Sequence, residues 1–457
     1  MENNRRLLSL DILRGIDMFL LTVIGPVFWA VNKAWTMPEA VQLQFKHAWG
    51  GFTLWDIIMP LFIFSCGAAV PYALSKRLDD DGWATGAFWK HVFGRVLLLW
   101  FCGMLVQGDL ATFDPLKISP YNNTLQTIAA GYLIAALVML IPVRALRAFM
   151  PFVFAIAYGA LMHFCGDYSK DGNIAQVVEQ NVLHAILPDG SAAFKTHGYT
   201  WFLTTLMFGA MALCGAQCAE ILRGKWPNGR KATVLLVLGG VLLGAGWALT
   251  LAVPCIKHIY TVSFTCQAMG WCVLALALLY VLTDILPCRR GWWIFTLYGQ
   301  CALTAYMATH FFKPALTACV KTITQGFPRY IDKMYMPLAE AIVTTIVLTV
   351  ILVFRRRLRG TRPVAEASNT DDEPSVPQVS GADAAPAFKS QLMSGAIADR
   401  FKIPGLETKQ AAAPKNANEP VSQAAHVKTK LKLHASPESS TPSVSLEPIA
   451  PDANGDV

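Results

Sequence analysis

The feature that most constrains this chain is a series of apolar blocks, each about as long as a helix that crosses a lipid bilayer, which takes roughly 20 residues. We expect ten such helices before residue 355, at 12–32, 53–74, 88–108, 123–141, 143–165, 199–222, 232–253, 260–282, 292–313 and 335–354. Lipid cannot satisfy the hydrogen bonds of an open strand edge, so these blocks should be helical. The sequence therefore predicts an all-α membrane protein with about ten transmembrane helices.

Composition agrees with this prediction and places a boundary near residue 360. Hydrophobic residues make up 54% of the 457 residues and charged residues only 15%, whereas soluble chains carry about 25% charged residues. From Gly360 onward the chain has few aromatic residues and no sustained periodicity. Such a segment cannot bury enough apolar surface to offset its conformational entropy. We expect a membrane domain over 1–359 and a disordered cytoplasmic tail over 360–457.

Lysines and arginines indicate how the helices are oriented. With a cytoplasmic N-terminus, every inner connection contains a basic pair and no outer connection does, which is the positive-inside pattern. The inner residues are then Arg5, Arg6, Lys76, Arg77, Arg144, Arg147, Arg223, Lys225, Arg230, Lys231, Arg289 and Arg290, followed by the run RRRLR at 355–359. Both termini are cytoplasmic in this arrangement. The net charge of +8 mostly reflects it, and we expect no nucleic-acid partner.

Charged residues inside a span are costly and usually functional, and the segment SLDILRGIDMF at 9–19 contains three of them. Asp11 and Arg14 are three residues apart, so they share a helix face and can form an ion pair. Asp17 lies deeper in the span. These charges also argue against a cleaved signal peptide. The structural alternative is an anchor pair at the cytoplasmic interface, with Arg14 reaching toward the headgroups.

A second group of polar residues surrounds the start of the second span. Thr53 and Asp56 fit a T-x-x-D capping box, which is a complete structural role for Asp56. His47 lies just upstream, in the first outer loop. Histidine is the side chain best suited to proton transfer near neutral pH, and Asp56 could orient it. The alternatives are a carboxylate that only caps the helix and an ordinary loop histidine.

Five motifs, in order, resemble those of the heparan-α-glucosaminide N-acetyltransferase family, most closely its bacterial branch with a domain of unknown function. They read RRLLSLDILRGIDMF, HAWGGFTLWDIIMPLFIFSCGAAVP, NTLQTIAAGYL, PCIKHIYTVSF and YGQCALTAYM, and the resemblance covers about residues 5–355. It implies an integral-membrane acyltransferase that moves acetyl from cytoplasmic acetyl-CoA to an amino sugar or related glycan across the membrane. The expected location is a bacterial inner membrane.

The resemblance also implies roles for individual residues. The catalytic histidine of the family precedes the tryptophan and glycine of the second motif, which makes it His47 here, with Asp56 as its partner. His47 would either accept the acetyl group or take a proton from the acceptor amine, and both routes stay open. Candidate ligands of acetyl-CoA are Arg14, Arg95, Asp11 and Gln126, and both arginines are expected near the inner ends of their spans. Candidate contacts of the acceptor are Lys257, Tyr260 and Trp49.

The sequence departs from the family pattern at three places. Where eukaryotic members have an asparagine near the outer end of the first span, the stretch TVIGPVF has Gly25. The family's LQR is Leu125-Gln126-Thr127, and a Gly-x-Asn is Gly299-Gln300-Cys301. None of the eleven cysteines forms a CxxC motif, and we expect neither disulfides nor a metal site.

Two other classes of protein fit a chain of this kind. A secondary transporter could use Asp17 and Arg14 to line a pathway, although such transporters usually contain an internal repeat and we find no second copy of the motifs. A non-catalytic membrane scaffold could recruit partners through its tail. The expected partners of the acyltransferase are membrane lipid, acetyl-CoA and the glycan acceptor. A homodimer is left open.

Overall fold

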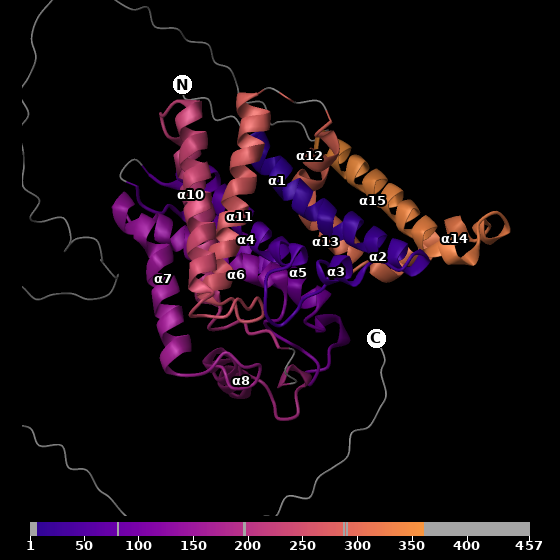
Figure 1. The fold of residues 1–457 in the computed structure, drawn as a ribbon, viewed down its shortest axis with the longest axis horizontal. Helices are drawn as coiled ribbons and strands as arrows, with labels where there is room; N and C mark the ends of the chain where they lie inside the picture. The colour runs from indigo at the N-terminus through magenta and orange to yellow at the C-terminus, as the bar shows by residue number, and fades with distance from the viewer. Residues whose placement is uncertain (1–6, 80–81, 195–197, 287, 289–290, 361–457) are drawn as a thin grey trace, which may run out of the picture. The chain divides into compact units, whose positions relative to one another are not determined.

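A computed structural model of the chain describes residues 7–79, 82–194, 198–286, 288 and 291–360 (Figure 1). The predicted tail at 360–457 lies outside these residues, apart from Gly360. Within them the chain is all-α, and the only strand-like feature is an isolated bridge between Leu78 and Ala84. The helices are α1 Leu8–Phe19, α2 Gly25–Ala34, α3 Glu39–Leu43, α4 Ile58–Leu74, α5 Gly86–Val106, α6 Thr124–Met139, α7 Arg144–Phe164, α8 Ile174–Ile186, α9 Thr205–Arg223, α10 Asn228–Leu249, α11 Val262–Tyr280, α12 Trp293–Gln300, α13 Ala302–Thr309, α14 Lys313–Thr324 and α15 Met336–Gly360.

Eight helical segments among the described residues are long and apolar enough to cross a membrane, which confirms an all-α, multi-pass membrane protein. They are Leu8–Ala34, Leu54–Arg77, Gly86–Val106, Arg144–Phe164, Thr205–Arg223, Asn228–Leu249, Val262–Ile285 and Lys333–Leu358. The other two predicted spans are helical but shorter. The fourth is α6, with 16 residues. The ninth is divided between α12 and α13, which have eight residues each and meet at the non-helical residue Cys301.

The first span is continuous but contains a wider turn at its centre. A π-helical segment, Leu20–Ile24, joins α1 to α2, and Pro26 lies in the first turn of α2. Proline has no N–H to donate to the preceding turn, so the local widening has an identifiable cause. This turn carries Leu21 to the cavity described below.

Glycines allow the central helices to approach one another closely. The span that contains α4 is the most buried of the eight, with 78% of its apolar window inside the protein. A Cβ at Gly67 of α4 would lie 1.9 Å from a backbone oxygen of α9, and one at Gly215 of α9 would lie 2.1 Å from a backbone oxygen of α4. Gly15 of α1 and Gly299 of α12 show the same reciprocal contact. Such small residues are typical of packed membrane helices.

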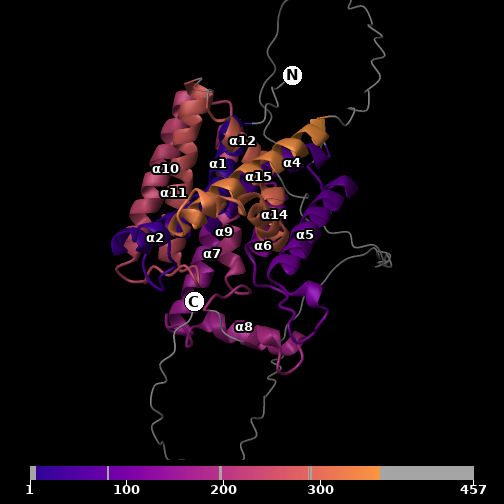
Figure 2. The ribbon, with the colours of Figure 1, turned by 90° about the vertical axis from the view of Figure 1, so that its right-hand side faces the viewer.

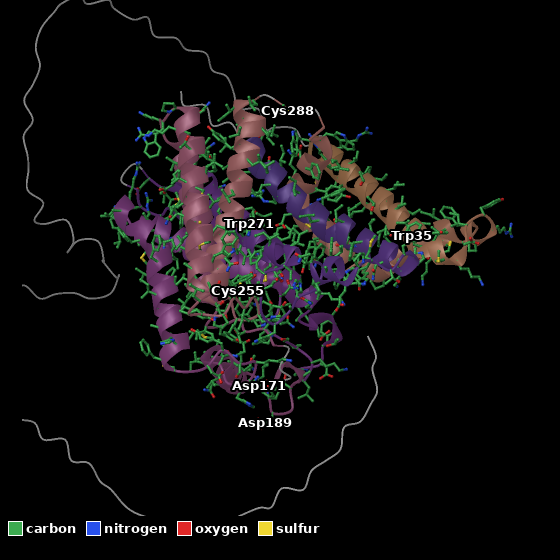
Figure 3. The ribbon with its side chains drawn as sticks, in the orientation of Figure 1. Trp35, Asp171, Asp189, Cys255, Trp271 and Cys288 are labelled. Atoms are coloured by element: carbon green, nitrogen blue, oxygen red, sulfur yellow. The ribbon has the colours of Figure 1, made fainter. Side chains whose placement is uncertain are left out.

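The connections that form the candidate site gather at one end of the helices. Figure 2 shows α8 lying across this end. Cys255, Asp171 and Asp189 lie toward the same end, and Cys288 lies toward the other (Figure 3). The loop that contains Lys257 therefore lies on the same side as α8.

Candidate functional site

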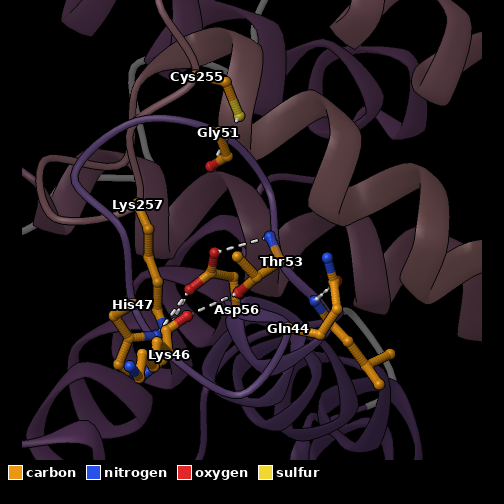
Figure 4. Close-up of polar contacts among 9 residues, drawn as sticks. Gln44, Lys46, His47, Gly51, Thr53, Asp56, Cys255 and Lys257 are labelled. Atoms are coloured by element: carbon orange, nitrogen blue, oxygen red, sulfur yellow. Dashed lines mark hydrogen bonds and ion pairs between the residues drawn. The ribbon is translucent and has the colours of Figure 1, made fainter. Parts of the chain in front are cut away.

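His47 lies in a loop that is folded back on itself between α3 and α4. The backbone N–H of Trp55 donates to the carbonyl oxygen of Gln44 (2.9 Å), and the N–H of Leu54 donates to Oε1 of the same residue (3.1 Å). The Thr53 hydroxyl donates to the carbonyl oxygen of Lys46 at 3.1 Å. These bonds close the loop and bring His47 next to the 3₁₀ turn Leu54–Ile57, which leads into α4 (Figure 4).

Asp56 combines the two roles between which the sequence could not choose. The predicted capping box is confirmed, and the Thr53 backbone N–H donates to Oδ2 of Asp56 at 2.9 Å. The other carboxylate oxygen, Oδ1, lies 2.7 Å from Nδ1 of His47. The carboxylate is 1% exposed, and the hydrogen bond from Thr53 fixes its direction. Because Asp56 contacts Nδ1, Nε2 is the ring nitrogen of His47 that is not bound to the carboxylate and could take part in proton transfer or nucleophilic attack.

A contact between two loops brings Lys257 to this pair. The Gly51 N–H donates to the carbonyl oxygen of Cys255 at 2.8 Å, and the Cys255 thiol lies 3.7 Å from the carbonyl oxygen of Gly51. Gly51 has a φ of +99°, a conformation that favours glycine. The loop between α10 and α11 is thereby held against the His47 loop, two residues from Lys257 (Figure 4).

Lys257 contacts both members of the pair. Its Nζ lies 3.3 Å from Oδ1 of Asp56, 3.0 Å from Nδ1 of His47 and 3.4 Å from Nε2. The side chain is 4% exposed, and this burial lowers the pKa of Lys257 to about 8, against the opposing effect of Asp56. The family resemblance implied a contact between Lys257 and the acceptor. The structure places Lys257 against the catalytic candidates themselves, so the three form one cluster.

The two other candidate acceptor residues, Trp49 and Tyr260, pack against other rings. The ring of Trp49 stacks on His258 with centroids 5.1 Å apart, and Tyr199 contacts the same histidine ring at 4.2 Å. Burial, followed by the neighbouring charges, lowers the pKa of His258 to about 4. Tyr260 is 1% exposed and packs edge-on against Phe208. Neither Trp49 nor Tyr260 lines the cavity described next.

A cavity of about 520 Å³ opens beside the cluster. Both His47 and Lys257 line it. The rest of its wall combines aromatic rings, amides and apolar side chains, namely Leu21, Trp55, Ile58, Met59, Phe62, Gln107, Asn122, Thr124, Tyr199, Trp201, Tyr306 and His310. Tyr199 and Trp201 were not among the predicted site residues. Both lie at the start of the predicted span 199–222, where aromatic residues are typical of a membrane interface, so the sequence carried no signal specific to a site.

Glu179 of α8 holds the aromatic wall in place. Its Oε2 accepts hydrogen bonds from the backbone N–H groups of Trp201 (2.9 Å) and Phe202 (3.0 Å). The residue is 4% exposed, and burial raises its pKa to about 7 although these bonds oppose the shift. Glu179 was also missed, because a single acid in an amphipathic loop helix resembles a solvated residue.

A smaller cavity of about 100 Å³ adjoins the first, and the two share Phe62, Thr124 and Tyr306. Arg14 and Arg95 line the smaller cavity together. At 1.5 Å per residue, Arg14 lies about 9 Å from the start of α1 and Arg95 about 14 Å from the start of α5. Arg95 is therefore at the middle of α5. This differs from the expected position near the inner end of the span.

The remaining donor candidates have structural partners. Asp11 pairs with Arg14 at 3.8 Å, as their spacing predicted. The Gln126 side chain closes the capping box at the start of α6: its Oε1 accepts from the N–H groups of Asn122 and Asn123, and its Nε2 donates to the Pro120 carbonyl oxygen. Gln126 lines neither cavity.

The described residues contain no group of three His, Cys, Asp or Glu side chains that could hold a metal ion, and the eleven cysteines are free thiols. No curated protein matches the chain. A family model described as a domain of unknown function, DUF5009, matches residues 6–111. The match extends from α1 to the residues just after α5, and includes Arg14, His47, Asp56 and Arg95 but not Lys257.

Proposed function

We propose that this protein is an integral-membrane acyltransferase that moves an acetyl group from cytoplasmic acetyl-CoA to the amine of an amino sugar or related glycan on the other side. The observation that carries the proposal is the His47–Asp56–Lys257 cluster, which faces a cavity adjoining a second one that contains two arginines. The resemblance of the five motifs supports it independently.

His47 supplies the base or nucleophile in this proposal. Asp56 accepts from Nδ1 and holds the imidazole with Nε2 available. Nε2 then either takes a proton from the acceptor amine or attacks the thioester carbonyl itself. The capping bond to Thr53 fixes Asp56, so the orientation of His47 is set by the start of α4.

Lys257 stabilises negative charge rather than binding the acceptor. Attack on a thioester carbonyl places a negative charge on its oxygen, and a cation held beside that oxygen stabilises the charge. The Lys257 ammonium lies 3.0 Å from the imidazole, so it is close to any carbonyl that His47 can reach. Its contact with Asp56 keeps the amine in the charged form that this role requires.

Arg14 and Arg95 contribute to binding the donor. The smaller cavity adds apolar walls, including Met18 and Leu99, to the two guanidinium groups. An acyl-pantetheine arm requires such a narrow apolar passage, and guanidinium groups along it can bind phosphates or carbonyls of the donor. Both chain termini are cytoplasmic in this proposal, so the donor enters from the cytoplasm and His47 faces the other side.

The test is vectorial transfer by the full-length protein in liposomes. Labelled acetyl-CoA is supplied on one side, a panel of amino sugars on the other, and labelled N-acetyl sugar is measured. His47→Ala should lower the rate by about 10²- to 10⁴-fold. His163→Ala, an exposed histidine on α7, is the matched control and should retain full activity.

Three outcomes separate the alternatives. A His47→Ala variant that keeps more than about a tenth of the rate would exclude His47 as the catalytic group. Sugar uptake without acetylation would favour a transporter. Asp17, which that alternative placed in a pathway, is fully buried and lines neither of these two cavities. The absence of both activities would favour a scaffold.

A further inference from the structure

The catalytic cluster contains a primary amine, which is the same functional group as the proposed acceptor. Lys257 Nζ lies 3.0 Å and 3.4 Å from the two ring nitrogens of His47, and both side chains line the cavity of about 520 Å³. An acyl group delivered to His47, or held by a donor beside it, is therefore within reach of Lys257 as well as of an incoming acceptor.

We propose that Lys257 is a self-acylation site, which takes the acetyl group from the bound donor when the acceptor is absent. This inference rests on the proposed function for its acyl donor. It goes further by assigning a covalent modification to a residue that would otherwise only stabilise charge.

The chemistry balances with a thioester as the only co-reactant. The Lys257 ammonium first gives a proton to His47 or water. The neutral Nζ then attacks the thioester carbonyl, a C–N bond forms and the C–S bond breaks, and the thiolate leaves and is protonated. The products are N-acetyllysine and a free thiol, with one proton released overall. No electrons are exchanged with an outside oxidant or reductant.

The environment of Lys257 makes its amine more reactive toward a thioester than the amine of an ordinary exposed lysine. A pKa of about 8 leaves roughly a tenth of the Lys257 amine neutral at pH 7, about 300-fold more than a lysine at the usual 10.5. At 4% exposure the amine is reached through the cavity rather than from bulk water. Asp56, 3.3 Å away, opposes the reaction by holding the amine as an ammonium.

Acetylation would switch the site off. N-acetyllysine carries no positive charge, so Asp56 would lose its ion pair and the site would lose its charge-stabilising cation. The added acetyl group would also occupy part of the cavity that the acceptor needs. A protein supplied with donor but starved of acceptor would therefore inactivate itself.

The experiment measures acetylation of each lysine by peptide mass spectrometry, using the full-length protein in nanodiscs without acceptor. Two probes are used separately: ¹³C-labelled acetyl-CoA and S-acetyl-N-acetylcysteamine, a small thioester that carries no phosphates. Lys46, exposed and adjacent to His47, and Lys231, buried at 9% exposure outside both cavities, are the controls. Lys257 should be acetylated at least tenfold faster than either.

Variants and competition sharpen the result. Adding the amino-sugar acceptor should suppress acetylation of Lys257. Asp56→Asn should speed its reaction with the small thioester by up to about tenfold at pH 7, because the neutral fraction can rise from roughly a tenth to one. If that variant does not fold, the comparison of the three lysines in the wild type decides alone.

Each outcome bears on the inference. Lys257 reacting no faster than Lys46 overturns it. Transfer to the sugar when it is supplied, together with an unmodified Lys257 in the samples that contain no acceptor, overturns the inference while the proposed function stands. Reaction of Lys257 with the small thioester but not with acetyl-CoA supports the reactive lysine and counts against acetyl-CoA as the donor. If neither transfer to the sugar nor modification of Lys257 is detected, both the proposed function and this inference are overturned.

Discussion

Asp56→Asn should destabilise the protein by an amount that depends on pH in a defined way. Asparagine keeps an oxygen that can accept from the Thr53 N–H, so the helix cap survives. What the substitution removes is the negative charge 3.3 Å from the buried Lys257 ammonium. In the variant the pKa of Lys257 must fall further below its wild-type value of about 8.

The ability of Lys257 to lose its proton limits the size of this effect. At pH 7, neutralising an amine with a pKa of about 8 costs about 1.4 kcal/mol. Because Lys257 can become neutral when its partner is lost, loss of the ion pair can lower the free energy of unfolding by at most that amount. The limit is about 2.7 kcal/mol at pH 6 and falls close to zero above pH 8. A further penalty of about 1 kcal/mol for weaker hydrogen bonds does not depend on pH.

The sign follows from proton linkage. The pKa of Lys257 is lower in the folded protein than in the unfolded chain, so the unfolded chain binds more protons between the two values and stability rises with pH there. In the wild type this rise begins near pH 8, and in Asp56→Asn it begins lower. The difference in free energy of unfolding between the wild type and Asp56→Asn should therefore decrease by up to about 1.4 kcal/mol per pH unit from pH 6 to pH 8.

The assay is unfolding in detergent micelles at pH 6, 7, 8 and 9, with both proteins carrying His47→Gln so that the comparison isolates Lys257 and residue 56. A third protein that also carries Lys257→Met should show no such pH dependence relative to a Lys257→Met reference. A difference that stays constant from pH 6 to pH 8 would refute the reasoning, because Lys257 would then not be the charge that Asp56 stabilises.

Two further predictions concern the cavity wall and the donor site. Glu179, with a pKa raised to about 7 from the usual 4.5, should make the wild type about 3 kcal/mol less stable as pH rises from below 4.5 to above 7. Glu179→Gln should remove that slope in thermal unfolding at pH 5 and 8, and parallel profiles would contradict the assignment. Arg95→Gln should weaken acetyl-CoA binding by roughly 10- to 150-fold, with partial rescue by Arg95→Lys. Arg230→Gln, whose guanidinium lies over the exposed Trp226, should bind normally, and a folded Arg95→Gln variant with normal affinity would exclude Arg95 as a ligand.

The long spans could be predicted because length and hydropathy alone determine them. The ninth span could not be predicted as a broken helix. Gly299 brings α12 so close to α1 that a Cβ would lie 2.0 Å from a backbone oxygen of Asp11, and the helix stops at Cys301, two residues later. That contact joins residues almost 290 positions apart. Local periodicity carries no information about it.

The candidate site could be predicted where its residues are neighbours in sequence. The capping box of Thr53 and Asp56, and the ion pair of Asp11 and Arg14, follow from local spacing. The approach of Lys257 to His47 joins loops 210 residues apart. The motif pointed to Lys257 as functional, but only the contact with Asp56 indicates what it can do.

Lys257 also reports how the site treats any amine that enters it. Burial lowers the pKa of Lys257 despite an adjacent carboxylate, so an acceptor amine buried to the same extent in this site would be held preferentially in its neutral form. A free sugar amine is not buried before it binds, and an amine with an ordinary pKa near 8 is mostly protonated at pH 7 and cannot attack a thioester. If the pKa of this amine fell by one to two units when it entered the cavity, about half or more of the amine would be neutral at pH 7 before His47 acts. In the proposed reaction, burial in the cavity and His47 would then both contribute to deprotonation of the acceptor amine. Replacing His47 should therefore lower the transfer rate less for acceptors of low amine pKa than for those of high amine pKa.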